Sequence, residues 1–134
     1  MEIKEILKKY NNIGVVGMSA NAFKAAHTVP MYMYSKNYHI FPINPNSLEI
    51  SGMKVFQDIA DVDGVIEILN VFRRSEDCLE VVEKAVERKK AKGDINVIWL
   101  QEGIINDTAK KLAEENAIEF VQDKCILKEY NRYF

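Results

Sequence analysis

The strongest constraint on the fold comes from residues 13–28, where an apolar run ends at a glycine and an amphipathic stretch follows. Ile13–Val16 is apolar, Gly17 and Ser19 come next, and apolar residues at helical spacing begin at Ala25. This order predicts a buried parallel strand that turns into a helix. The free N–H groups and the dipole at such a helix start attract phosphate. The stretch therefore suggests that the chain binds a nucleotide.

The glycine pattern in this stretch differs from the dinucleotide fingerprint G-x-G-x-x-G. After Gly17 the next glycine is Gly52. An NAD site also usually has an acidic residue at the end of the second strand, where this chain has Ile43, Asn44 and Pro45. Both observations disfavour NAD, so the rest of the chain has to indicate the kind of nucleotide.

Helical and strand-like patterns alternate along the chain. We expect helices over residues 2–9, 25–35, 75–92 and 106–116, and strands over 13–16, 39–43, 65–71, 97–100 and 118–121. Ser75 is expected to cap its helix at the start and Gly93 at the end. Pro30 falls inside the 25–35 helix, where it is either tolerated in the first turn or kinks the helix. A short extended piece is possible over 54–56.

The alternation predicts the α/β class. Near-continuous apolar strands separated by helices indicate a Rossmann-like, doubly wound, mostly parallel five-stranded sheet with helices on both faces. Residues 1–134 form one domain in this interpretation, with an N-terminal helix over 1–10 and a C-terminal tail over 123–134 that includes a possible helical turn.

Composition excludes some classes of binding partner for the chain. A net charge of -2 means that the chain lacks the excess of basic residues typical of nucleic-acid-binding proteins. No apolar run approaches the ~20 residues that span a bilayer, and charges interrupt the apolar pattern of the N-terminus, which argues against a signal peptide. We therefore expect a cytoplasmic protein without nucleic-acid or membrane partners. Cys78 and Cys125 lack metal-site spacing and are expected to be reduced thiols.

The loops after the five strands should meet at one edge of the sheet, where ligands of open α/β sheets bind. They bring the cations Lys24, Arg73, Arg74 and Lys124, which suit phosphates. Phe72 and Pro45 suit a flat base or an apolar arm. No nucleophile–base pair, paired carboxylates or metal-ligand cluster is visible, so no catalytic or metal residue is assigned. Taken alone, Arg73 and Arg74 could instead be solvated surface charges.

Four motifs in order resemble the stand-alone CoA-binding proteins, which are related to the CoA-binding domain of the succinyl-CoA synthetase alpha subunit. The motifs are Val16–Ser19, Pro42–Pro45, Val71–Asp77 and Ile98–Ile104, and a closing Gln122–Ile126 also matches. The resemblance runs from about residue 13 to residue 128. Each motif is weak alone, whereas the ordered set is specific.

The resemblance implies a coenzyme A or acyl-CoA site at this edge. The loop from Gly17 would hold phosphates with its backbone, Asn44 would lie beside the adenosine, and Gln101 would face the arm or thiol end. The implied binding residues are Gly17, Met18, Ser19, Ala20, Lys24, Asn44, Pro45, Val71, Phe72, Arg73, Arg74, Gln101, Glu102, Gly103 and Ile104.

One departure from the family weakens the expected phosphate contacts. Relatives often carry a proline and an arginine shortly after the Gly-x-Ser turn, where this chain has Ala22, Phe23 and Lys24. A lysine is a point charge and cannot form the two-pronged contact of an arginine.

The resulting hypothesis is a non-catalytic carrier, sensor or regulatory protein for CoA. An alternative is a small NAD(P)-dependent oxidoreductase or an acyl-CoA-utilising enzyme that uses the same edge. A third is an interaction module that kept the fold and lost the ligand. The second synthetase domain with its phosphorylated histidine is absent, so the ligase reaction is not expected. The acyl group, protein partners and oligomeric state stay open.

Overall fold

A five-stranded parallel sheet forms the centre of the molecule in a computed structural model that describes all residues 1–134. The strand order is β2-β1-β5-β6-β7, and every neighbouring pair is parallel. The strands are β1 (Asn12–Val16), β2 (His39–Ile43), β5 (Ile68–Val71), β6 (Val97–Leu100) and β7 (Glu119–Val121). The predicted five-stranded parallel sheet is confirmed.

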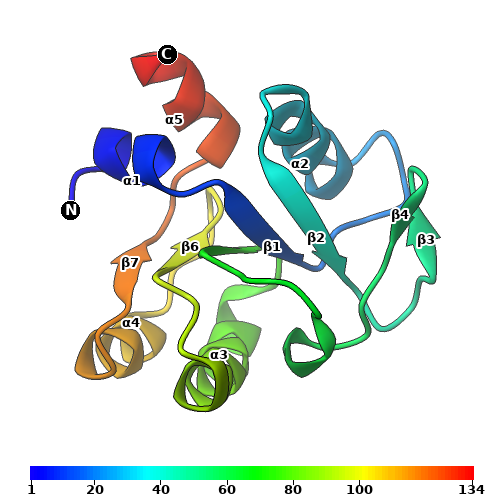
Figure 1. The fold of residues 1–134 in the computed structure, drawn as a ribbon. Helices are drawn as coiled ribbons and strands as arrows, with labels where there is room; N and C mark the ends of the chain where they lie inside the picture. Colours follow the sequence, from blue (N-terminus) through cyan, green and yellow to red (C-terminus); the bar gives the residue numbers. More distant parts are fainter.

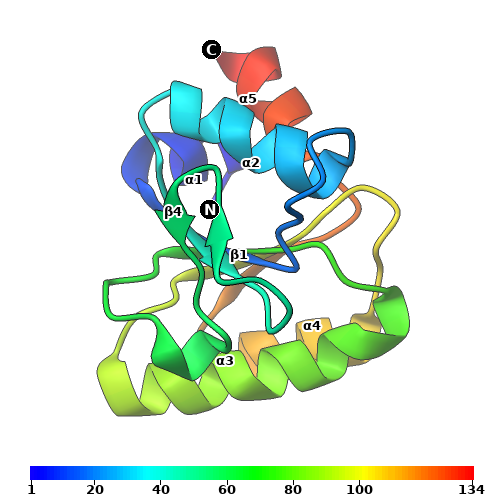
Figure 2. The ribbon, with the colours of Figure 1, turned by 90° about the vertical axis from the view of Figure 1, so that its right-hand side faces the viewer.

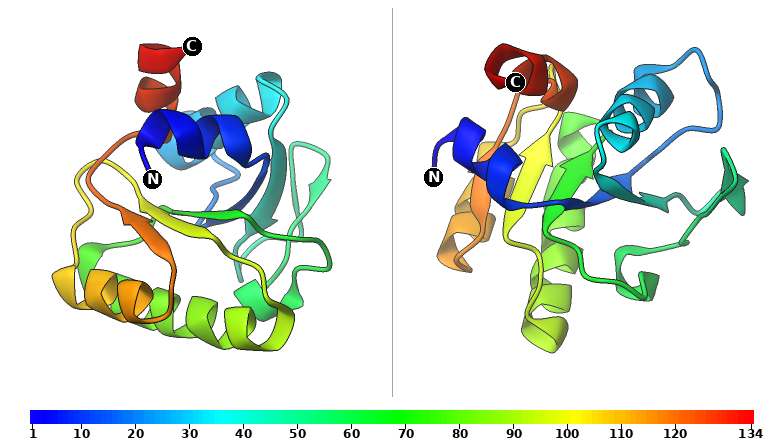
Figure 3. Two further views of the ribbon diagram at one scale, coloured as in Figure 1. Left: turned by 60° about the vertical axis from the view of Figure 1, so that its left-hand side comes forward. Right: turned by 45° about the horizontal axis from the view of Figure 1, so that its top comes forward.

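Helices cover both faces of this sheet, as predicted. On one face lie α1 (Ile3–Lys9), α2 (Ala25–Ser35) and α5 (Ile126–Tyr133), and on the other lie α3 (Cys78–Lys92) and α4 (Asp107–Glu115) (Figures 1 and 3). Each face has its own hydrophobic core, with Trp99 in the first and Leu69 in the second. None of the helices has the length and apolarity needed to cross a membrane.

The order of the strands reverses at β1, which lies between β2 and β5 (Figure 1). The chain leaves β1 through α2 to reach β2 on one side. It returns through a small hairpin, β3 (Glu49–Ile50) and β4 (Met53–Lys54), and the 3₁₀ turn η1 (Ile59–Asp61) to β5 on the other side. The carboxyl ends of β1 and β5 therefore flank the point where doubly wound sheets bind their ligands.

Two sequence predictions near β5 are wrong in detail. The strand begins at Ile68, and Val65 is exposed to solvent. The helix expected from Ser75 begins at Cys78, after a 3₁₀ turn η2 (Ser75–Asp77). The Ser75 hydroxyl does not cap α3, because its oxygen accepts a hydrogen bond from the N–H of Ile105 at 3.0 Å. A contact across the edge of the sheet replaces the local cap.

Other local predictions agree with the structure. Gly93 ends α3 with φ +76°, and the Asn106 side chain caps α4 by accepting a hydrogen bond from Ala109 N–H at 2.9 Å. The possible extended piece over 54–56 corresponds to β4 together with Phe56, which forms a parallel bridge to Ile43. One prediction fell short: residues 126–133, expected as a tail with a possible helical turn, form the helix α5.

A buried ion pair organises the connection into β5. The Arg88 guanidinium lies 2.9 Å from the Asp94 carboxylate, and both residues are buried. The Asp94 carboxylate also accepts a hydrogen bond from Ile66 N–H at 3.0 Å. Arg88 further donates to the carbonyl oxygens of Ile59, Val62 and Gly64. One side chain of α3 thus satisfies three backbone carbonyls that have little access to water.

Replacing Arg88 with methionine should lower the free energy of unfolding by about 3–5 kcal/mol, because the Asp94 charge and three carbonyls lose their partner. Urea unfolding measures this loss. Lys90→Met, at an exposed position of the same helix, serves as the control and should change stability by less than about 0.5 kcal/mol. Equal effects of the two substitutions would contradict the structural role of Arg88.

Candidate functional site

The loops that follow β1, β5, β6 and β7 gather at one edge of the molecule (Figure 2). We call this the carboxyl edge. It is where the sequence places the candidate binding residues, and the structure brings those loops together. Their positions depend on a few local contacts.

Gly17 allows the backbones that leave β1 and β5 to approach each other closely at the carboxyl edge. Its N–H donates to Ile43 O at 2.9 Å, and Phe72 N–H donates to Val16 O at 2.9 Å, so the backbones leaving β1, β2 and β5 remain hydrogen-bonded. Gly17 has φ +83°, and a Cβ atom there would lie 2.4 Å from the Phe72 carbonyl oxygen. A residue with a side chain could not occupy this position without moving the backbone.

Pro30 explains how the loop after Gly17 is attached to α2. A proline within a helix has no N–H, so the carbonyl four residues earlier, that of Ala26, has no helical partner. Ser19 N–H donates to that Ala26 oxygen at 3.1 Å. The Ser19 carbonyl in turn accepts a hydrogen bond from His27 Nδ1, at 2.7 Å. His27 therefore positions the loop, and its Nδ1 is the protonated ring nitrogen in this contact because a carbonyl can only accept.

The same loop leaves donors free for a ligand. The backbone N–H groups of Ala20, Ala25 and Ala26 make no hydrogen bond within the chain. Lys24 stands at the start of α2, is exposed and forms no ion pair. Free N–H groups at a helix start beside a cation suit a phosphate group.

Two cavities open at the carboxyl edge. The larger, about 650 Å³, lies between α2, the ends of β5 and β6, and the start of α5, and we call it the large cleft. The smaller, about 240 Å³, lies on the α3 side, and we call it the small cleft. The large cleft is lined by Ala25, Val29, Phe72, Arg73, Arg74, Gln101, Glu102, Ile104, Cys125, Leu127 and Lys128. The small cleft is lined by Val16, Ile43, Pro45, Gln57, Asp58, Ile59, Arg73, Asp77, Glu80, Val81 and Lys84.

Arg73 lines both clefts and forms no ion pair within the chain. Its neighbour Arg74 is engaged by Asp77, with Nε 2.9 Å from the carboxylate. The hydrogen bond to Asp77 raises the pKa of Arg74, and the same bond lowers the pKa of Asp77. Arg73 therefore has no direct ion-pair partner at the junction of the clefts, although its charge also helps to lower the pKa of Asp77, whereas Arg74 is paired directly with Asp77.

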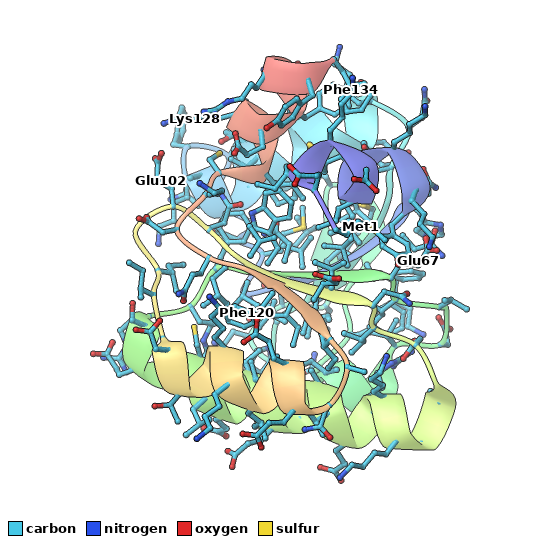
Figure 4. All side chains as sticks on the ribbon, turned by 90° about the vertical axis from the view of Figure 1, so that its left-hand side faces the viewer. Met1, Glu67, Glu102, Phe120, Lys128 and Phe134 are labelled. Carbon is cyan, nitrogen blue, oxygen red and sulfur yellow. The ribbon has the colours of Figure 1, made fainter.

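Lys128 and Glu102 form an ion pair at the mouth of the large cleft, with Nζ 3.0 Å from a carboxylate oxygen (Figure 4). The hydrogen bond to Glu102 raises the pKa of Lys128. This pair joins the β6–α4 loop to α5, which closes one side of the large cleft.

Gln101 lies at the base of the large cleft and is 5 % exposed. Its Oε1 accepts hydrogen bonds from Asn70 Nδ2 at 3.2 Å and from Ile126 N–H at 3.0 Å. Its Nε2 has no partner in the chain. Because the oxygen end of the amide is held by the protein, the amide nitrogen is the end left free for the cleft.

Several sequence candidates lie at the carboxyl edge with their side chains engaged or buried. Met18 and Val71 are fully buried, so only their backbones are available. The Asn44 side chain donates to Met18 O at 2.8 Å and accepts from Asn46 N–H at 2.8 Å. Gly103, with φ +86°, donates its N–H to the Asp123 carboxylate at 2.7 Å.

Sequence reasoning missed the contribution of α2 and α5 to the large cleft. Ala25 and Val29 line one wall, and Leu127 and Lys128 line another. The apolar spacing of Ile126, Leu127 and Tyr130 was the signal that could have identified α5 as a packed helix. No three His, Cys, Asp or Glu side chains lie together in a way that could hold a metal ion.

Comparison with known proteins finds a family that matches most of the chain. The family described as CoA binding domain matches residues 11–131. The uncharacterized protein YneT of Bacillus subtilis is 38% identical over 125 residues, which cover 93% of this chain and 89% of YneT.

Two solved structures are similar over almost their whole length. A hypothetical protein from Pyrococcus horikoshii OT3 superposes with a TM-score of 0.91 at 30% identity, over 98% of this chain and 89% of that one. A Thermus thermophilus protein gives a TM-score of 0.91 at 27% identity, over 100% of both chains.

Gly17→Ala should destabilise the protein more than Gly52→Ala. Both glycines have positive φ, but a Cβ at Gly52 meets no atom within 4 Å. The left-handed backbone alone should cost about 1–2 kcal/mol at Gly52, and the clash with Phe72 should add about 1–3 kcal/mol at Gly17. Thermal or urea unfolding of both variants measures the difference. Equal losses would contradict the close approach of the β1 and β5 loops.

Proposed function

Because this chain belongs to the CoA binding domain family, we propose that it binds coenzyme A or an acyl-CoA across the carboxyl edge. In this proposal it acts as a carrier, sensor or regulatory protein. The observation that carries the proposal is the position of Arg73. This cation has no ion pair and lies at the junction of the large, mainly apolar cleft and the small, charged cleft.

The chemistry of CoA matches this arrangement. CoA has an adenosine with a 3′-phosphate at one end, a diphosphate in the middle, and a long, partly apolar arm that ends in a thiol. In the proposed mode the diphosphate lies between Arg73 and the free N–H groups of Ala20, Ala25 and Ala26. Lys24 would add a second cation to the phosphates.

The two clefts suit the two ends of this ligand. The small cleft contains three carboxylates, those of Asp58, Asp77 and Glu80, against two cations. That charge balance favours the uncharged adenine, with Pro45 as an apolar surface, and in this mode the 3′-phosphate lies outside the small cleft. The large cleft offers Phe72, Ile104 and Leu127 to the apolar part of the arm.

Addition of CoA should raise the thermal unfolding midpoint by several degrees at about 100 times its Kd, because a ligand at that concentration stabilises by roughly 2.7 kcal/mol. Dephospho-CoA, NAD and ATP are measured beside it. A shift with NAD and none with CoA would overturn the proposal and favour the oxidoreductase alternative.

Arg73→Ala should weaken CoA binding by about tenfold to a hundredfold, since a hydrogen bond to a charged group contributes about 1.5–3 kcal/mol. Titration calorimetry or the concentration dependence of the thermal shift measures the loss. Arg74→Ala is the matched control, because Asp77 already balances that charge, and it should weaken binding clearly less. Equal losses, or none at Arg73, would show that the phosphates lie elsewhere.

A further inference from the structure

Cys125 is placed where a ligand in the large cleft could reach it. It is the residue before α5 begins, it lines the large cleft, and 9 % of it is exposed. The other cysteine, Cys78, is fully buried in the opposite core, with its thiol directed to Arg74 O. Burial raises the pKa of Cys78 to about 11, and the Asp77 charge adds to this. Cys125 therefore lines the large cleft, whereas Cys78 has no access to it.

A free donor lines the same cleft as Cys125. Gln101 holds the residue next to Cys125 through the bond from Ile126 N–H to its Oε1. Gln101 is 5 % exposed, and its amide nitrogen has no hydrogen-bond partner in the chain and is open to solvent at the base of the same cleft. A donor left free in an otherwise buried side chain is available to an acceptor supplied by a ligand. An amide carbonyl in the arm of the ligand, close to its sulfur end, would fit both groups.

The charged groups along the large cleft indicate which end of a bound ligand lies at which end of the cleft. Arg73 stands at the junction with the small cleft and suits phosphate. Cys125 lies toward α5, near the Lys128–Glu102 pair. Cys125 and Lys128 line the same cleft, and Cys125 is the group after Glu102 that helps to raise the pKa of Lys128. A molecule with phosphates at one end, amides along an apolar arm and sulfur at the other end matches this order.

We propose that Cys125 forms a mixed disulfide with CoA held in the large cleft, by exchange with the disulfide form of CoA. This inference rests on the proposed CoA binding. The Cys125 thiolate attacks one sulfur of the CoA disulfide, a bond forms between Cys125 Sγ and that sulfur, and the disulfide of the ligand breaks. The second CoA leaves as a thiolate and takes up a proton equivalent to the one lost from Cys125. One disulfide replaces another, so no further oxidant is needed.

The exchange has a consequence for specificity. An acyl-CoA has its sulfur blocked as a thioester and cannot form this bond. Covalent capture would therefore respond to the oxidation state of the CoA pool, and acyl-CoA would bind reversibly in the same cleft. A thiol reductant would release the captured CoA.

Intact-protein mass spectrometry of the full chain tests the exchange. With CoA disulfide, the protein should gain the mass of one CoA less the hydrogen atoms lost in forming the disulfide, and dithiothreitol should reverse the gain. The reaction should be at least about tenfold faster than with oxidised glutathione at equal concentration, because binding positions the CoA sulfur. Cys78→Ala should react like the original protein, and Cys125→Ala should form no adduct.

Two controls separate this inference from the proposed function. Desulfo-CoA, which has the arm without the sulfur, should slow the reaction of Cys125 with CoA disulfide. Thermal shift of Cys125→Ala with reduced CoA reports binding alone. If that shift is present but Cys125 reacts no faster than with oxidised glutathione, or desulfo-CoA gives no protection, the disulfide inference fails and CoA binding stands. If CoA gives no shift in either protein, both fail.

Discussion

The close approach of Gly17 to the Phe72 carbonyl is the constraint on which the carboxyl edge depends. The backbone of β1 turns away directly over the end of β5, and a Cβ atom would lie 2.4 Å from that oxygen. The absence of a side chain lets the loops after β1 and β5 separate to opposite faces of the sheet. Arg73, the residue after this contact, therefore reaches the cavities on both faces.

A small number of polar contacts then holds the surrounding loops. Pro30 leaves the Ala26 carbonyl of α2 without a helical partner, and this carbonyl accepts a hydrogen bond from Ser19 N–H. The missing helical hydrogen bond thereby attaches the preceding loop to α2. Gln101 joins β5 to the start of α5 through one amide oxygen. Each contact satisfies backbone or amide groups that have little access to water, and together they leave specific donors unpaired at the clefts.

The pattern of free and engaged groups suits the extended, partly anionic ligand proposed above. Free N–H groups and Arg73 lie near the middle of the site, and apolar walls and a thiol lie on the α5 side. Membership of the CoA binding domain family is consistent with this distribution. The proposed disulfide exchange at Cys125 would add a covalent step to simple binding.

The sequence by itself determined the strands of the sheet, the helices α1 to α4 and their order, though not every boundary, because apolar periodicity and helix ends such as Gly93 and Asn106 act over a few residues. It also placed the candidate loops, since the carboxyl ends of parallel strands meet at one edge. The tertiary structure decided which side chains are free. Ser75 bonds to a residue 30 positions away, and α5 packs against α2 and completes the large cleft. Met18 and Val71 turn into the core. These outcomes depend on packing between distant segments, which local spacing does not encode.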